Sequence, residues 1–243
     1  MTDRPNVLWI MADQLRFDYL SCYGHPHLQT PHIDALARRG VKFPNPYIQS
    51  PVCGPSRMSA YTGRYVRSHG STWNGIPLRV GEPTLGDHLR EAGAKAVLVG
   101  KTHMVADREG MAWLGIDPNS EIGVRRSECG FDAFERDDGL HPDSARQNWS
   151  AYDDYLVSLG YKSENPWEDC ANSGLDENGE LMSAWLLKNS RMPANVPEEH
   201  SETAYMTNRA MAFMEGAMQE DTPWMCHLSY IKPHWPYIVP APY

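Results

Sequence analysis

Three short apolar runs, far apart in the chain, most constrain how this sequence folds. They read NVLWIMA at 6–12, AKAVLVGK at 94–101 and PWMCHLSYI at 223–231. Continuous apolar runs of this length predict strands that are buried on both faces. Helical patterns lie between them, at residues 30–40, 55–62, 84–93 and 201–218. Strands that alternate with helices predict an α/β fold, with a mainly parallel central sheet and helices on both faces.

Local signals place the ends of these elements. In the helix at 30–40, Thr30 is a candidate N-cap and Gly40 a candidate end. The apolar stripe of that helix consists of Ile33, Leu36 and Ala37. Residues from about 105 to 200 are polar and irregular, so we expect an irregular surface insertion there, with short helices.

The composition excludes several classes of partner. The 243 residues carry a net charge of −9, which argues against nucleic acid. No apolar run approaches the ~20 residues of a membrane helix, so we expect no membrane partner. The start of the chain lacks the apolar core of a signal peptide, and the five cysteines are scattered. We therefore expect a cytoplasmic protein.

The stretch PVCGPSRMSAYTGRY at 51–65 places a thiol at the start of a helix. Pro55 suits the first helical turn, so Cys53 lies where free N–H groups and the positive end of the helix dipole meet. Arg57, four residues on, lies on the same face. This arrangement predicts a small anion pocket, although a buried structural cysteine beside an arginine is the alternative. Cysteine phosphatases place five residues between these two side chains, whereas three intervene here.

Each expected strand ends in polar residues. Asp13-Gln14 follows the first strand, Lys101-Thr102-His103 the second and Lys232-Pro233-His234 the third. Because catalytic groups gather at the carboxyl ends of parallel strands, we expect these side chains to lie near Cys53.

These motifs resemble the sulfatase family, within the alkaline phosphatase superfamily. The match to its signature runs through Cys53-Gly54-Pro55-Ser56-Arg57 and Thr62-Gly63-Arg64. NVLWIMADQ, GKTHM and KPHWPYIVPAPY resemble further segments of the family. Asp13-Gln14 resembles the form found in choline sulfatases and phosphonate monoester hydrolases, and the stretch at 195–243 resembles phosphonate monoester hydrolases. Lys101 and His103, by contrast, follow the sulfatase pattern.

The resemblance implies that Cys53 is oxidised to formylglycine, whose hydrate is the nucleophile. It also implies a divalent metal, Ca²⁺ before Mg²⁺ or Mn²⁺, bound by Asp13, Gln14 and the oxygen of the modified Cys53. Arg57 and Lys101 are expected to stabilise charge on the ester. His103 and His234 are expected to act as base and acid.

Three side chains are candidates for binding the substrate: Lys101, His234 and Asn74. Asn74 resembles a substrate-binding asparagine of the phosphonate hydrolases, but it precedes Gly75 and suits a turn equally well. His25, His27 and His32 lie among prolines, with no carboxylate at ligand spacing, and we expect them to be surface side chains.

The sequence thus predicts a metal-dependent sulfuric ester hydrolase that acts on a small anionic ester and depends on a formylglycine-generating enzyme. Two alternatives stay open: a hydrolase of phosphonate monoesters or phosphodiesters, and a thiol enzyme that uses Cys53 unmodified.

A third alternative is an inactive fragment. The family completes its metal site with an Asp-Asn or Asp-His pair and a lysine after the Pro-His-x-Pro segment, and neither Asp87-His88 nor Asp137-Asp138 is a good substitute. We therefore expect residues 1–243 to be the N-terminal portion of a single sulfatase catalytic domain, truncated on its C-terminal side.

Overall fold

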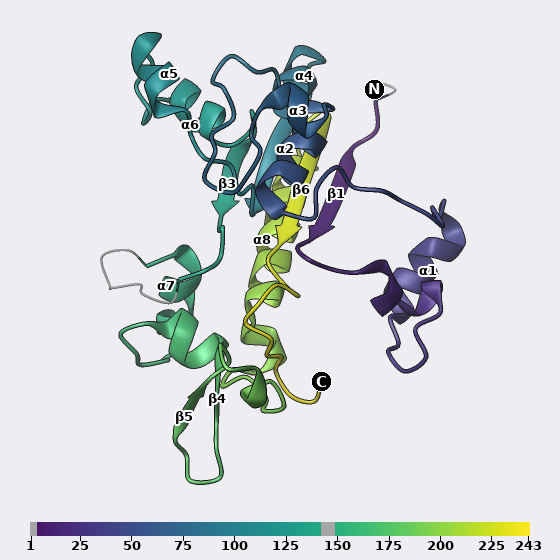
Figure 1. The fold of residues 1–243 in the computed structure, drawn as a ribbon, viewed down its shortest axis with the longest axis vertical. Helices are drawn as coiled ribbons and strands as arrows, with labels where there is room; N and C mark the ends of the chain where they lie inside the picture. The colour runs from purple at the N-terminus through teal and green to yellow at the C-terminus, as the bar shows by residue number, and fades with distance from the viewer. Residues whose placement is uncertain (1–3, 142–148) are drawn as a thin grey trace.

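The computed structural model describes residues 4–141 and 149–243, and their centre is a parallel sheet (Figure 1). The order of its four strands is β1-β6-β2-β3, and every neighbouring pair is parallel. The last strand in the chain thus lies between the first two. The strands are β1 (Val7–Ala12), β2 (Lys95–Gly100), β3 (Asp132–Arg136) and β6 (Trp224–Tyr230). The predicted α/β fold with a mainly parallel sheet is confirmed.

Eight helices and several shorter turns surround the sheet in the described part of the chain. The α-helices are α1 (Pro31–Arg39), α2 (Cys53–Thr62), α3 (Val66–His69), α4 (Leu85–Glu91), α5 (Arg108–Trp113), α6 (Glu121–Ser127), α7 (Ala151–Ser158) and α8 (Glu202–Ala217). The 3-10 turns are η1 (Phe17–Tyr19), η2 (Ser21–Tyr23), η5 (Leu187–Asn189) and η6 (Glu198–His200), and η4 (Trp167–Ala171) is one π-helical turn. A small antiparallel hairpin consists of β4 (Ser173–Leu175) and β5 (Leu181–Ser183).

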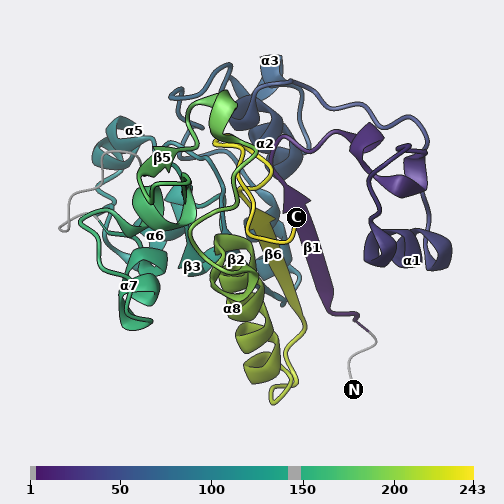
Figure 2. The same ribbon diagram turned by 90° about the horizontal axis from the view of Figure 1, so that it is seen from below.

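Helices cover both faces of the sheet, as the pattern predicted. Strand β2 alternates between the two cores: Val97 and Val99 pack with α8 and α7, while Ala96 and Leu98 pack with α2 and Phe131. Figure 2 shows α8 on one side of the sheet and α2 on the other. Side chains of successive strand residues point to opposite faces, so one buried strand serves two layers.

Strand β1 is less buried than its apolar run predicts. Val7, Leu8 and Ile10 are 42%, 41% and 53% exposed, and β1 pairs only with β6 among the described strands. Helix α1 does not cover it; the helix lies out beyond β1, against η2 (Figure 2). The expectation of a buried first strand is therefore wrong, because burial depends on position in the sheet as well as on the run of residues.

Helix α1 forms where predicted, but its details differ. Thr30 occupies the N-cap position without a side-chain cap to the helix backbone. Its hydroxyl donates instead to the side chain of Asp34 and accepts from the backbone N–H of Ser21. Ile33 and Leu36 of the apolar stripe are exposed. By contrast, Gly63 ends α2 in the left-handed conformation, as its place in the motif predicts.

The stretch from about 105 to 200 is more deeply integrated than expected. It contributes β3, which pairs with β2 in the central sheet. Tyr152, Leu156 and Trp167 are fully buried against the α8 face. The short helices were correctly expected, but a purely surface location is wrong. The strand was missed because DAFER is short and carries three charged side chains.

Candidate active site

The carboxyl end of β1, the segment after β6 and the amino end of α2 converge on one cavity. Its volume is about 580 Å³. Its polar lining consists of Asp13, Gln14, Ser50, Cys53, Ser56, Arg57 and His234, and its apolar lining includes Met11, Leu15, Ile48 and Val52. Parallel strands place their carboxyl ends at one edge of the sheet, so residues distant in sequence meet there.

Three charged side chains form the floor of the site. Nζ of Lys101 donates to Oδ2 of Asp13 at 2.5 Å, and Nη2 of Arg57 lies 3.8 Å from the same oxygen. All three side chains are nearly fully buried. Two cations thus face one carboxylate in a region that water scarcely enters. The excess positive charge favours an anionic ligand.

One terminal nitrogen of Arg57 is held by hydrogen bonds, whereas the other makes only the longer ion pair with Asp13. Its Nη1 donates to the carbonyl oxygen of Lys101 and to Oγ of Ser229, both at 2.7 Å, and lies 3.3 Å from the hydroxyl of Tyr61. Its Nη2 is buried and has no hydrogen-bond partner among the described residues. A buried donor without a partner costs free energy, so an anion that accepts from Nη2 gains a preorganised contact.

Cys53 is the first residue of α2 and is half-buried. Burial raises the pKa of its thiol, but a hydrogen bond with His103 and the charges of His103 and Lys101 outweigh that effect and lower the pKa to about 7. A structural cysteine buried in apolar surroundings has a raised pKa instead, as Cys129 does. The environment of Cys53 is therefore that of a reactive position.

Asn74 contacts the start of α2. Its Oδ1 accepts from the N–H of Gly54 at 2.8 Å, and its amide lies within 3.8 Å of the Cys53 sulfur. A side chain at Gly54 would collide with Asn74, because a Cβ would lie 2.6 Å from its Oδ1. Asn74 thus reaches the site, beyond serving the turn before Gly75.

The two candidate acid–base histidines approach from different loops. His103 follows β2, and its Nδ1 is buried without a hydrogen-bond partner among the described residues. His234 lines the cavity, and its Nδ1 lies 2.7 Å from the carbonyl oxygen of Trp235. Both imidazoles therefore belong to the site that contains Cys53.

The residues expected to bind a metal fit part of a cation site. Asp13 and Gln14 line the cavity beside Cys53. The Nε2 of Gln14 donates to the hydroxyl of Tyr237 at 2.9 Å, so its amide oxygen remains available. Hard cations prefer carboxylate and amide oxygens, and they take six or more of them. Residues 4–141 and 149–243 contain no cluster of three or more His, Cys, Asp or Glu side chains that could hold a metal by themselves.

The remaining candidates lie elsewhere. The carboxylate of Asp87 belongs to the capping box of α4, and Nδ1 of His25 accepts from the N–H groups of His27 and Leu28.

Sequence reasoning missed Ser229 and Tyr61, which hold Arg57, and Asp138, which contacts the backbone at Thr102 and His103. The signal for Asp138 was its place two residues after the end of β3, but the sequence pattern did not identify that strand.

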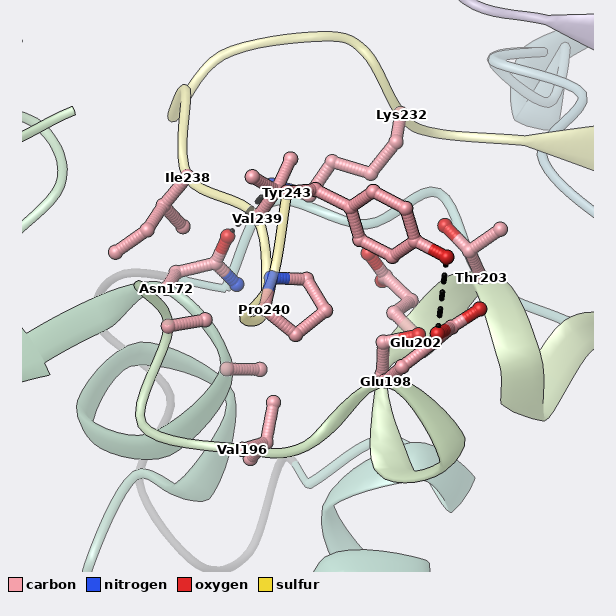
Figure 3. A pocket seen from close by; sticks show the side chains of 13 residues that line it. Asn172, Val196, Glu198, Glu202, Thr203, Lys232, Ile238, Val239, Pro240 and Tyr243 are labelled. Carbon is pink, nitrogen blue, oxygen red and sulfur yellow. Dashed lines mark hydrogen bonds between the residues drawn. The ribbon is translucent and has the colours of Figure 1, made fainter. Parts of the chain in front are cut away.

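A second cavity, of about 220 Å³, lies beside the loop that carries His234 (Figure 3). Lys232 lines it and donates to Oδ1 of Asn172 and to the carbonyl oxygen of Pro236, both at 2.8 Å. Burial, together with the charge of Asp137, raises the pKa of the neighbouring Glu202 to about 8. Lys232 thus links Pro236, in the loop that contains His234, to Asn172, which directly precedes β4.

The fold and the site define the class of this protein. The mainly parallel central sheet with its helices is the architecture of alkaline phosphatase-like proteins. The chain belongs to the Sulfatase family, whose model matches residues 5–243. Members of this family generally use a divalent metal and a formylglycine. The resemblance seen in the sequence is confirmed.

Three relatives show how far the similarity extends. The multifunctional alkaline phosphatase superfamily protein PehA of Trinickia caryophylli is 30% identical over 99% of this chain and 44% of its own length. An arylsulfatase of Clostridium perfringens is 27% identical over 96% and 44%. The structure of the phosphonate monoester hydrolase SpPMH from Silicibacter pomeroyi aligns with a TM-score of 0.77 and 30% identity, covering 98% of this chain and 43% of that one.

The chain spans less than half the length of these relatives. Among the residues that the structure describes, no helix has the length and apolar character needed to cross a bilayer.

Proposed function

We propose that the protein to which this chain belongs hydrolyses a small anionic ester, a sulfate ester in the first instance, with a formylglycine made from Cys53 as nucleophile. The observation that carries this proposal is the buried Nη2 of Arg57 near Cys53, which has no hydrogen-bond partner in the described part of the chain, together with the second cation that Lys101 adds. A tetrahedral anion is the ligand that such donors favour.

The residues divide the work by position. The hydrated formylglycine supplies one hydroxyl for attack and a second that allows the aldehyde to re-form when the acid is released. Arg57 and Lys101 hold the anionic oxygens of the ester and stabilise the charge that develops on them. His103, in contact with residue 53, accepts a proton there, and His234 donates one to the departing alcohol.

Asp13 and Gln14 would hold a divalent cation together with the oxygen of the modified Cys53, with Ca²⁺ before Mg²⁺ or Mn²⁺. When bound, such a cation polarises the ester and lowers the pKa of the attacking hydroxyl. The protein's own contribution is the orientation of these oxygens, which β1 and the tie between Gln14 and Tyr237 support.

A phosphonate monoester or phosphodiester is the second candidate substrate. Two observations favour it: the contact of Asn74 with the start of α2, and the high structural similarity to a phosphonate monoester hydrolase. Both ester types present a tetrahedral anion, so the same floor suits either.

Two experiments test the proposal. Coexpression with a formylglycine-generating enzyme should lower the mass of tryptic peptide 43–57 by about 18 Da, because oxidation of the Cys53 thiol to an aldehyde removes one sulfur and two hydrogens and adds one oxygen. The Cys53→Ala variant is the matched control and should show no such shift. A peptide that stays unmodified, in protein that turns over ester, would favour the thiol alternative.

The longest natural form of the protein should then be assayed on 4-nitrophenyl sulfate and on a 4-nitrophenyl phosphonate monoester. Sulfate turnover is expected to be faster. A ratio of about 100 in kcat/KM toward the phosphonate, equivalent to about 2.7 kcal/mol, would establish the second candidate instead.

A further inference from the structure

The backbone at His103 adopts an unusual conformation. Its φ is +54°, in the left-handed region, and His103 is not a glycine. Residues with a Cβ enter this region at an energetic cost and stay there only when neighbouring contacts hold them. His103 follows β2 at the carboxyl end of the sheet, close to the start of α2 where Cys53 lies, so this conformation sets where the imidazole lies relative to Cys53.

The side chain of Asp138 makes the contacts that hold it. Its Oδ1 accepts from the N–H of Thr102 at 3.1 Å and from the N–H of His103 at 3.0 Å. The sheet register explains the meeting: Gly100 lies opposite Arg136, so the residues two positions further along each strand are neighbours. One carboxylate oxygen therefore ties down both amides at the turn after β2.

A charged network fixes Asp138 in turn. Nη2 of Arg136 donates to its Oδ2 at 2.7 Å, and Nε of Arg136 pairs with Glu128 at 2.7 Å. The other carboxylate oxygen of Glu128 accepts from the hydroxyl of Thr102 at 2.8 Å. Thr102 therefore contacts Asp138 through its backbone N–H and Glu128 through its hydroxyl, and Arg136 links the two carboxylates. The Asp138 carboxylate is held by Thr102 on one side and by Arg136 on the other.

We propose that Asp138 is a positioning residue, which holds the backbone of His103 in the left-handed conformation and thereby keeps the imidazole against residue 53. This inference rests on the proposed function, because it takes His103 as the base of that reaction. Asp138 acts through His103 and not on the substrate. Both of its oxygens are engaged by protein donors.

Amide hydrogen exchange on the 243-residue chain tests the contact itself. In Asp138→Ala, the His103 amide should exchange at least about tenfold faster, since it loses its acceptor. In Asp138→Asn, the side-chain oxygen remains and protection should largely return. Asp176→Ala is the matched control, because Asp176 also accepts two backbone N–H groups, from Asn178 and Glu180, in a distant turn.

Steady-state kinetics on the longest natural form of the protein test whether the contact of Asp138 with the His103 backbone serves catalysis. For Asp138→Ala we expect kcat to fall about 10- to 100-fold with KM within about twofold, because positioning of a base affects the chemical step. Asp138→Asn should stay within about threefold of wild type, and Asp176→Ala should be unchanged. If Asp138→Ala does not fold, Arg136→Gln, which frees Oδ2 at an exposed position, should give smaller effects in the same direction.

The outcomes separate the two ideas. The positioning role would be overturned if the His103 amide exchanged at the wild-type rate in Asp138→Ala. It would also be overturned if Asp138→Ala and the wild type had equal kcat values. Fast exchange in Asp138→Asn as well would do the same, because the retained oxygen should rescue. A wild-type protein that hydrolyses no ester would overturn the proposed function, and with it the catalytic purpose of Asp138, even if the exchange result stands.

Discussion

In protein that has not been modified at Cys53, the thiol should be unusually acidic, and His103 should be the main reason. The structure lowers its pKa from 9.0 to about 7. At pH 7, about half of such a thiol is ionised, against about 1% for a thiol with the ordinary value, a ratio of about 50. His103→Gln removes both the hydrogen bond and the charge of the imidazole. Burial then dominates, and the pKa should return to near 9.

The alkylation rate of Cys53 at a single pH understates this change in pKa. A thiolate of higher pKa is intrinsically more nucleophilic, and a Brønsted slope of about 0.45 over two units restores about eightfold. The net loss in alkylation rate at pH 7 is therefore about sixfold. The midpoint of the pH–rate profile reports the pKa directly and should move from near 7 to near 9.

Iodoacetamide labelling of Cys53 between pH 5 and 10, followed by mass spectrometry of peptide 43–57, measures this midpoint. His25→Gln, a change in a distant loop, is the control and should leave the profile unaltered. A wild-type midpoint near 9, or one that His103→Gln does not move, would refute the reasoning.

Three further predictions concern stability, measured by urea unfolding. Gly100→Ala should cost about 2 to 4 kcal/mol, because φ is +103° there and a Cβ would lie 2.1 Å from the carbonyl oxygen of Ser229; an unchanged midpoint would contradict the strand register. Burial lowers the pKa of His227 to about 3, so between pH 6.5 and 3 the unfolded chain binds a proton that the native protein excludes, and stability should fall with falling pH by at most about 1.4 kcal/mol per unit. His227→Gln should flatten that slope, and an equal slope in both proteins would count against a neutral buried imidazole. Lys232→Met should cost about 1 to 3 kcal/mol through its two lost hydrogen bonds, whereas Lys188→Met on the surface should cost nothing measurable.

Local signals in the sequence determined most of the elements. Pro55 at the start of α2 and Gly63 at its end act through the backbone of their own neighbours, so the helix and the place of Cys53 were predictable. The apolar runs identified three of the four strands of the central sheet. Because those strands are parallel, the residues that follow them were expected at one edge, and Asp13, Lys101 and His234 are found there.

Other features depended on which strands became neighbours. The exposure of β1 follows from its place at the edge, and the role of Asp138 follows from the pairing of β3 with β2. The position of the Arg57 guanidinium depends on Ser229, 172 residues away in the chain, whose hydroxyl oxygen accepts from Nη1. A sequence pattern reports the periodicity of one segment, which residues a few positions apart decide. Strand order and register bring together atoms from distant segments, and only the packed tertiary structure determines those contacts.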